Sequence, residues 1–274
     1  MRPRRSQWGV YLIAAVMSAV SLIPFLVLLW IALSTPATVS ALGPGTLPEF
    51  HVRNFTDAWR LSSMGTAIMN SLLITASALA VLVTCASSAG FAIARFPGRF
   101  HRAVLYLFLF SMMIPGIINT VPLYTLMRSI GGINTRWAMA LVCATNALPF
   151  SVFLYSNFIR SMSREIEESA IVDGCTWVSA FFRITFPLLK PVTSAVVIIN
   201  GLGIWNNYAQ AVFFLQKPAV RTIPLAVSMF FQQYGAKWNL MAAAAAIGAA
   251  PAVIAFIVFQ KYFIKGLAAG ALKG

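Results

Sequence analysis

The chain has 274 residues, of which 59% are hydrophobic and only 9% are charged, and its mean hydropathy is +0.82. A soluble domain carries about 25% charged residues, so this composition excludes an ordinary soluble protein and predicts an integral membrane protein. The formal net charge of +14 raises nucleic-acid binding as an alternative. The basic residues flank apolar segments and do not gather on one soluble face, which favours the membrane protein.

Six long intervals of the sequence carry no charged residue, and each of them is at least 23 residues long. A membrane-spanning helix needs about 20 mostly apolar residues, and a charge near the bilayer centre is costly. We therefore expect an all-α integral membrane protein with six transmembrane helices in a single domain, residues 1–274. The expected spans lie near 10–33, 66–93, 103–127, 138–158, 193–214 and 239–263.

The first expected span begins like a secretory signal, with MRPRRS before an apolar run and Val39-Ser40-Ala41 as a candidate cleavage site. The apolar run extends from Val10 to about Leu33, which is too long for an ordinary signal sequence. We interpret it as an uncleaved first helix.

The basic residues predict the orientation in the membrane. With the N-terminus inside, 13 of the 20 Lys and Arg residues lie on the cytoplasmic side and seven on the other. The excess of positive charge marks the cytoplasmic side, so we expect both termini to be cytoplasmic. The loop between the fourth and fifth spans is then cytoplasmic as well.

This loop, residues 160–191, is the one long polar stretch in the second half of the sequence. It contains four of the six acidic residues, namely Glu165, Glu167, Glu168 and Asp173. Ser163 can cap a helix that begins at Arg164, and Gly174 permits the left-handed turn that ends such a helix. We expect a short, capped helix followed by a tight turn.

A second short helix is expected after Gly174. Its apolar face would comprise Trp177, Val178, Phe181 and Phe182, and Pro187 and Pro191 would end it. Small residues at Ser169, Ala170 and Gly174 would let another protein approach closely, and the carboxylates would meet a basic partner. We interpret the loop as a docking site for a soluble motor protein. The alternative is a helix lying on the lipid surface, but such helices carry Lys and Arg on their polar face, and this one is acidic.

Polar side chains also occur at membrane depth. They include Asn70, Thr75, Asn119, Thr120, Asn146, Asn200 and a group in the fifth span, Trp205, Asn206, Asn207, Tyr208 and Gln210. Hydrogen bonds between helices would explain any single one of them. The fifth-span group joins aromatic faces with amides, a combination that suits sugars, and we expect it to line a translocation path with Asn119. No span carries an ionisable residue in its middle, which argues against a proton relay or an ion-coupling carboxylate.

Prolines interrupt three expected spans. They are Pro115 and Pro122 in the third, Pro149 in the fourth and Pro251 in the sixth. Because proline removes a backbone donor, we expect kinks and pivots at these positions.

The sequence contains no pattern typical of a catalytic or metal site. Cys85, Cys143 and Cys175 form no CxxC pair, and His51 and His101 are isolated. The GxxxxGK[ST] pattern of a phosphate-binding loop is absent, so we expect no ATP binding by that route. We predict no catalytic residue, no metal ligand and no cofactor bound by this chain.

The loop resembles the EAA loop of ABC importer permeases. In this sequence the matching residues are Glu168, Ser169, Ala170, Gly174, Ile184 and Pro187. The chain departs from the family pattern at Ser169, where Ala is usual, and at Phe186, where Leu is usual, but the spacing is intact. The resemblance implies that these residues, with Asp173, couple the chain to an ATPase.

Further segments resemble the carbohydrate branch of that family, specifically the maltose-type second permease. They are 54–59, 70–72, 112–135, Trp205-Asn206-Asn207 and the tail 265–274. Asn207 stands where an acid is often found. The resemblance implies a type I importer permease (MetI-like) architecture in a bacterial or archaeal cytoplasmic membrane.

The resemblance also implies partners. They are a homologous second permease subunit, an ABC ATPase dimer that holds ATP and Mg, and an extracytoplasmic solute-binding protein or lipoprotein. The chain itself would be a non-catalytic subunit. Two alternatives stay open, a permease of the same kind for a polyamine or phosphate compound, and a self-sufficient secondary transporter.

Overall fold

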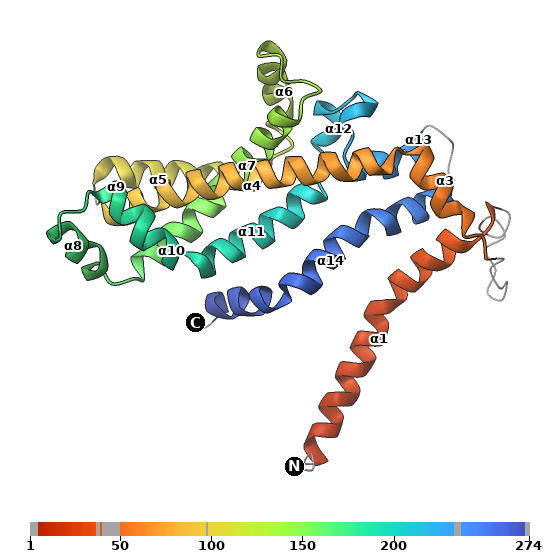
Figure 1. Cartoon of the computed structure of the whole chain (residues 1–274), viewed down its shortest axis with the longest axis horizontal. Coiled ribbons are helices and arrows are strands. Elements are labelled where there is room, and N and C mark those ends of the chain that lie inside the picture. Colours follow the sequence, from red (N-terminus) through yellow and green to blue (C-terminus); the bar gives the residue numbers. More distant parts are fainter. Residues whose placement is uncertain (1–4, 37–38, 40–49, 97, 233–236, 272–274) are drawn as a thin grey trace. The chain divides into compact units, whose positions relative to one another are not determined.

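The computed structural model describes residues 5–36, 39, 50–96, 98–232 and 237–271, and the regular structure in these ranges is helical throughout (Figure 1). The candidate cleavage site at 39–41 falls mostly outside them, as do residues 272–274 of the tail. The helices that begin before residue 170 are α1 Arg5–Leu33, α3 Arg53–Leu61, α4 Met64–Arg95, α5 Arg99–Ser111, α6 Thr120–Ser129, α7 Arg136–Arg160 and α8 Glu165–Val172. Those after it are α9 Trp177–Ala180, the π-helical η1 Phe181–Thr185, α10 Phe186–Leu188, α11 Lys190–Trp205, α12 Ala211–Phe214, the 3-10 turn η2 Pro218–Val220, α13 Ile223–Gln232 and α14 Trp238–Ala271.

Four of the six expected spans are each covered by one long helix, namely α1, α4, α7 and α14. In the described residues these four are long and apolar enough to cross a membrane, and a fifth crossing is possible if a bent pair of helices counts as one. No residue in the most apolar 18-residue stretch of α1 is buried within the chain. Its side chains are therefore available to lipid or to another protein.

The third expected span, 103–127, is divided. Helix α5 ends at Ser111, turns occupy 112–119, and α6 starts at Thr120. Pro115 lacks an amide donor and disfavours helical geometry at Ile114, which explains the break. Figure 1 shows that α6 stands away from the line of α5. A single continuous third helix, as the uncharged interval suggested, is not formed.

The fifth expected span is also built from pieces. Helix α11 ends at Trp205, residues 206–210 break the helix, and α12 follows. At its start α11 is bent by 72° from the segment Trp177–Leu188. Pro187 and Pro191 lie beside this bend, as expected for residues that end one helix and start the next.

Pro149 and Pro251 do not break the helices in which they lie, so the kinks expected there stay predictions. Helix α7 continues through Pro149, and α14 continues through Pro251. A proline inside a transmembrane helix is tolerated where neighbouring groups satisfy the freed carbonyl. Only the proline that is followed by glycine, Pro115, coincides with a break.

The described residues fall into two compact units. Unit 1 comprises Met1–Gly65 and Ala226–Pro251, and it is held by a buried amide. Asn54 of α3 donates to the carbonyls of Ala32 and Ser34, at 2.8 and 2.9 Å, and accepts from Asn239 of α14 at 3.0 Å. One side chain thus joins the end of α1 to the start of α14.

Unit 2 comprises Thr66–Leu225 and Ala252–Gly274, and its core lies where α4, α5 and α11 pack around α7. Helices α4 and α7 approach closely at Gly90, where a Cβ would lie 2.7 Å from that of Tyr155. Tyr155 donates to Thr193 of α11 at 2.9 Å, so α7 and α11 are also joined by a hydrogen bond. The tight contact requires glycine because no side chain fits between the two backbones.

A second structural amide, Asn70 of α4, lies in unit 2. It donates to the carbonyls of Ala219 and Arg221, at 3.0 and 2.9 Å, and accepts from the Arg136 guanidinium at 2.7 Å. Asn70, one of the polar residues expected at membrane depth, therefore joins the segment before α13 to α4 and α7.

Candidate functional site

Helix α8 lies in the 160–191 loop and starts directly after Ser163 and Arg164. The Glu165 amide donates to the Ser163 hydroxyl at 3.3 Å, and the helix begins at Glu165, one residue later than expected. Three glutamates occupy its first turn, where the helix dipole favours negative charge. The N-cap residue is Arg164, which makes no side-chain capping bond, so Ser163 accepts one bond just before the helix and is not the N-cap that the sequence predicted.

Gly174 ends α8 in the conformation that the sequence predicted. Its φ is +88°, its amide donates to the Ile171 carbonyl at 3.0 Å, and the Cys175 amide donates to the Ala170 carbonyl at 2.9 Å. This pair of bonds is the Schellman motif, which closes the helix and reverses the chain.

The two sides of α8 differ in what they expose. Glu167 and Ala170 are buried, whereas Glu165, Glu168, Ser169 and Val172 are exposed. These four exposed residues, spaced at i, i+3, i+4 and i+7, form the outward face of α8. Val172 on this face is 87% exposed. Ala170 lies on the opposite side and is 6% exposed, so its role at a contact surface stays a prediction that this face of α8 does not support.

The second short helix forms in three pieces, α9, η1 and α10. Thr176 caps it by accepting from the Ser179 amide at 3.2 Å. Phe181 is buried, but Val178 and Phe182 are exposed, so the predicted single apolar face is not formed. Val178 is already exposed within α9, before the π-helical turn of η1 begins, so only one side of the predicted face packs inward.

The other predicted coupling residues lie around these helices. Asp173 and Gly174 are exposed between α8 and α9, Ile184 is half-buried in η1, and Pro187 is exposed in α10. The structure therefore gathers the residues of the EAA-like pattern in one compact hairpin.

An ion pair anchors this hairpin to α4, and sequence reasoning missed it. The Arg95 guanidinium lies 3.0 Å from the Glu167 carboxylate, and their side chains are 4% and 0% exposed. The sequence placed Glu167 among carboxylates that meet an external partner, but its partner is internal. Helical periodicity relates residues only three or four positions apart, so it could not reveal a pair whose members are 72 positions apart in the sequence.

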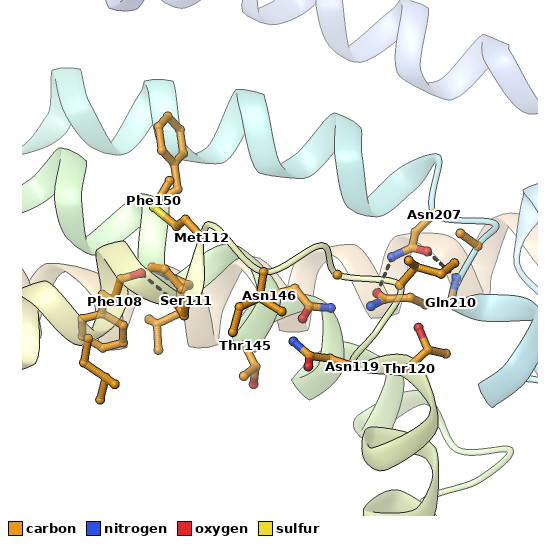
Figure 2. A pocket seen from close by; sticks show the side chains of 17 residues that line it. Phe108, Ser111, Met112, Asn119, Thr120, Thr145, Asn146, Phe150, Asn207 and Gln210 are labelled. Carbon is orange, nitrogen blue, oxygen red and sulfur yellow. Dashed lines mark hydrogen bonds between the residues drawn. The ribbon is translucent and has the colours of Figure 1, made fainter.

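A cavity of about 830 Å³ lies elsewhere in unit 2 (Figure 2). Its walls come from α5, the break at 112–119, α7 and the break after α11. The lining residues are Leu107, Phe108, Ser111, Met112, Ile114, Gly116, Ile117, Asn119, Thr120, Thr145, Asn146, Leu148, Pro149, Phe150, Asn207, Ala209 and Gln210. None of these side chains carries a charge.

The polar groups of the cavity are mostly amides, and we call it the amide cavity after Asn119, Asn146, Asn207 and Gln210. In Figure 2 these amides lie toward one side of the view and Phe108, Met112 and Phe150 toward the other. Asn207 donates to the Gln210 side chain at 3.0 Å and accepts from the Gln210 amide at 3.1 Å. This pair shapes the break after α11 and turns both amides into the cavity.

The amide cavity contains three of the six residues predicted for the translocation path, Asn119, Asn207 and Gln210. Trp205, Asn206 and Tyr208 do not line it. Asn206 is exposed and donates to the Leu202 carbonyl of its own helix at 3.0 Å. The aromatic walls are supplied by Phe108 and Phe150, which the sequence did not distinguish from its many other phenylalanines.

Among the residues that the structure describes, no group of three His, Cys, Asp or Glu side chains could hold a metal ion. The polar chemistry of this chain therefore gathers at two places in unit 2, the loop hairpin with its buried ion pair and the uncharged cavity. Long apolar helices, a polar hairpin and an uncharged cavity with amide groups are the features expected of a membrane protein that moves a solute.

The chain belongs to the family of binding-protein-dependent transport system inner membrane components, whose family model matches residues 86–268. It is therefore a multi-pass membrane permease subunit, not a catalytic one, with the MetI-like fold.

Relatives and solved structures agree with this assignment. The chain is 39% identical to the melibiose/raffinose/stachyose import permease protein MelC of Bacillus subtilis, over 96% of this chain and 95% of that protein. It is 28% identical to the diacetylchitobiose uptake system permease protein NgcG of Streptomyces coelicolor, over 92% and 85%. A crystal structure of a bacterial ABC transporter for the acidic polysaccharide alginate contains a chain of the same fold, with a TM-score of 0.79, 18% identity and coverage of 96% of this chain and 99% of that one.

Proposed function

We propose that this chain is the permease subunit of an ATP-driven importer for an uncharged sugar. The observation that carries the proposal is the amide cavity, where amide and hydroxyl groups face apolar and aromatic walls without any charge. Sugars present both hydroxyl groups and apolar C–H faces, so they need both kinds of wall. The amides of Asn119 and Asn146 are exposed and have no side-chain partner among the described residues. They are available to a ligand.

The names of the relatives support a sugar, since MelC and NgcG are named for sugar import or uptake. The uncharged lining also separates this chain from the remaining possibilities. A polyamine would need carboxylates and a phosphate compound would need basic groups, because an unpaired charge is costly to bury. A secondary transporter is disfavoured by membership of a binding-protein-dependent family.

The outward face of α8 supports docking to an ATPase. It combines two exposed carboxylates, at Glu165 and Glu168, with the exposed apolar side chain of Val172. A basic partner with an apolar groove would complement this face in charge and in shape. Closure of two ATPase subunits on ATP would then move the hairpin, and with it the helices around the cavity.

The remaining partners follow from the same family. The proposal includes a homologous second permease subunit and an extracytoplasmic binding protein that delivers the sugar. It places both termini and the 160–191 loop in the cytoplasm, in agreement with the distribution of Lys and Arg.

The substrate is tested with the assembled transporter. The chain is purified with its partner permease, ATPase and binding protein, and ATP hydrolysis is measured over a panel of neutral oligosaccharides, uronic acid oligosaccharides, polyamines and organic phosphates. Stimulation by neutral oligosaccharides alone is expected. Stimulation only by a charged solute would contradict the proposal.

The docking face is tested by cysteine crosslinking in a variant that lacks Cys85, Cys143 and Cys175. Single cysteines at Ser169 and Val172 should crosslink to the ATPase, while the matched control at Ala170 should not, because that side chain is 6% exposed. Labelling of Val172→Cys from outside intact cells would refute the cytoplasmic placement of the loop.

A further inference from the structure

The contacts around Glu167 extend beyond a single ion pair. Its Oε1 atom accepts from Nε and Nη2 of Arg95, at 3.1 and 3.0 Å, and from the Thr185 hydroxyl at 3.2 Å. Arg95 is the last residue of α4, Glu167 lies in α8, and Thr185 ends η1. One carboxylate oxygen therefore joins three separate elements, and we call these residues the Arg95–Glu167–Thr185 joint.

Two further bonds fix the same place. The Arg95 guanidinium donates to the Met162 carbonyl at 3.4 Å, and the Arg164 guanidinium donates to the Arg95 carbonyl at 3.2 Å. Both residues precede α8, so the entry to the hairpin is bound to the end of α4 as well. The aromatic contact of Phe91 in α4 with Phe181 in η1, with ring centroids 5.0 Å apart, adds an apolar link between the same elements.

The burial of this joint has a physical cost. The side chains of Glu167 and Thr185 are fully buried, and Arg95 is almost so. Taking two charges out of water is expensive, and apolar residues of similar volume often stabilise a fold as well or better. Stability alone is thus a poor explanation for a charged joint. A charged, directional contact instead holds its elements in one defined orientation.

We propose that the Arg95–Glu167–Thr185 joint transmits movement of α8 to α4, so that these residues act as positioning residues for the coupling of ATP hydrolysis to transport. The inference rests on the proposed docking of the loop to an ATPase. The partner would contact the outward face of α8, and the joint lies on its inward side.

The carboxylate also has an unused acceptor. Oε2 of Glu167 is buried and has no hydrogen-bond partner among the described residues. When α8 turns, Arg95 or Thr185 can transfer from Oε1 to Oε2 without leaving the carboxylate. The joint can therefore change its angle and keep the ion pair.

The test uses the complete transporter reconstituted in proteoliposomes. The variants are Arg95→Glu, Glu167→Arg and the double exchange, with Asp57→Asn as a control that removes the exposed i, i+4 ion pair between Arg53 and Asp57. The quantities measured are the amount of assembled complex, the rate of ATP hydrolysis and the amount of sugar transported per ATP. The amount of sugar transported per ATP distinguishes a loss of coupling from a loss of folded complex.

Each single exchange should lower transport per ATP at least about five-fold, the lower end for an energetic coupling between two sites. The double exchange should restore part of this loss, and Asp57→Asn should behave as the unaltered protein. Equal falls of transport and hydrolysis in variants that assemble a normal amount of complex would overturn the proposal. Unchanged transport per ATP in both single exchanges would overturn it too.

A milder variant covers the case in which the exchanges prevent folding. Thr185→Val removes one donor to Glu167 and keeps the shape of the side chain, so transport per ATP should fall while the complex still assembles. Unchanged transport per ATP in Thr185→Val would show that Thr185 does not contribute to the coupling. Unchanged transport per ATP in both Thr185→Val and Glu167→Gln would overturn the proposal.

Crosslinking from Val172→Cys in the same variants distinguishes the two levels of inference. If the cysteine does not crosslink even with Arg95 and Glu167 intact, docking of the loop is wrong. If it crosslinks in every variant and coupling is unaffected, docking stands and the joint is wrong.

Discussion

The loop hairpin of unit 2 contains a buried pair of opposite charges that are bonded to each other, whereas the side chains that line the amide cavity are uncharged and only Asn207 and Gln210 among its four amides pair with each other. Glu167 accepts three hydrogen bonds on one oxygen, while Asn146 has no side-chain partner among the residues described. Fixed, directional bonds suit a part that must transmit movement. Unpaired amides suit a surface on which successive sugar hydroxyls form and release hydrogen bonds.

The scaffold that both regions share should show the largest effect. Gly90→Val would place side-chain atoms against the Tyr155 Cβ and the Ser156 amide, which lie 2.7 and 3.0 Å from the position of a Cβ. Both neighbours are close to the backbone of α7 and cannot move aside, so we expect a cost of about 1–3 kcal/mol or more. The amount of protein in the membrane and its thermal stability in detergent measure this.

The matched control is Gly203→Val in α11, where a Cβ would meet nothing within 4 Å. The Gly203 variant should accumulate normally. Equal accumulation of the two variants would show that α4 and α7 do not pack as described.

A change at Gly174 should affect the loop alone. Gly174→Asp should lower uptake strongly without removing the protein from the membrane, because φ is +88° and the position lies beside the outward face of α8. Uptake by cells and immunodetection in membranes provide the two readouts. Normal uptake in this variant would contradict the docking model.

Gly174→Asn is the control for charge, since asparagine has the size of aspartate and tolerates left-handed geometry. It should retain more uptake than Gly174→Asp. Equal losses would assign the effect to the turn itself.

A change at Asn207 should affect the cavity alone. Asn207→Leu removes an amide that faces the cavity and orients Gln210, and the loss of one such hydrogen bond, about 0.5–1.5 kcal/mol, should lower transport up to about ten-fold. Stimulation of ATP hydrolysis should be less affected. The control is Asn206→Leu, whose amide bonds within its own helix. A larger loss of transport in Asn206→Leu than in Asn207→Leu would contradict the assignment of the translocation path to the amide cavity.

The smallest expected effect concerns the hydrogen bond between α7 and α11. Tyr155→Phe removes the donor to Thr193, and such bonds between membrane helices contribute about 0.6 kcal/mol on average. Thermal stability in detergent should fall slightly with transport per ATP unchanged. Tyr106→Phe in α5, whose side chain is exposed, is the control. A loss of transport in Tyr155→Phe at normal stability would place this contact in the transmission of movement.

Local features were predictable because they depend on neighbouring residues. Gly174 closes α8 as predicted, since a left-handed glycine acts within a few positions of the helix end, whereas the cap predicted at Ser163 is not formed. The division of the third span was not predicted, because an interval without charge shows that a helix can be buried in lipid but not that it is continuous. Pro115 broke the helix and Pro149 did not, although both are prolines within apolar segments.

The sequence by itself determined the class of protein, the long apolar helices and the identity of the loop, because hydropathy and local spacing carry that information. Only the tertiary structure decided which polar residues meet. It paired Arg95 with Glu167 across 72 positions, turned Ala170 inward, and selected Asn119, Asn207 and Gln210 for the cavity while leaving Trp205 and Asn206 outside. Such choices depend on the direction of each side chain and on the packing of distant helices, and neither is encoded in the spacing of residues along the chain.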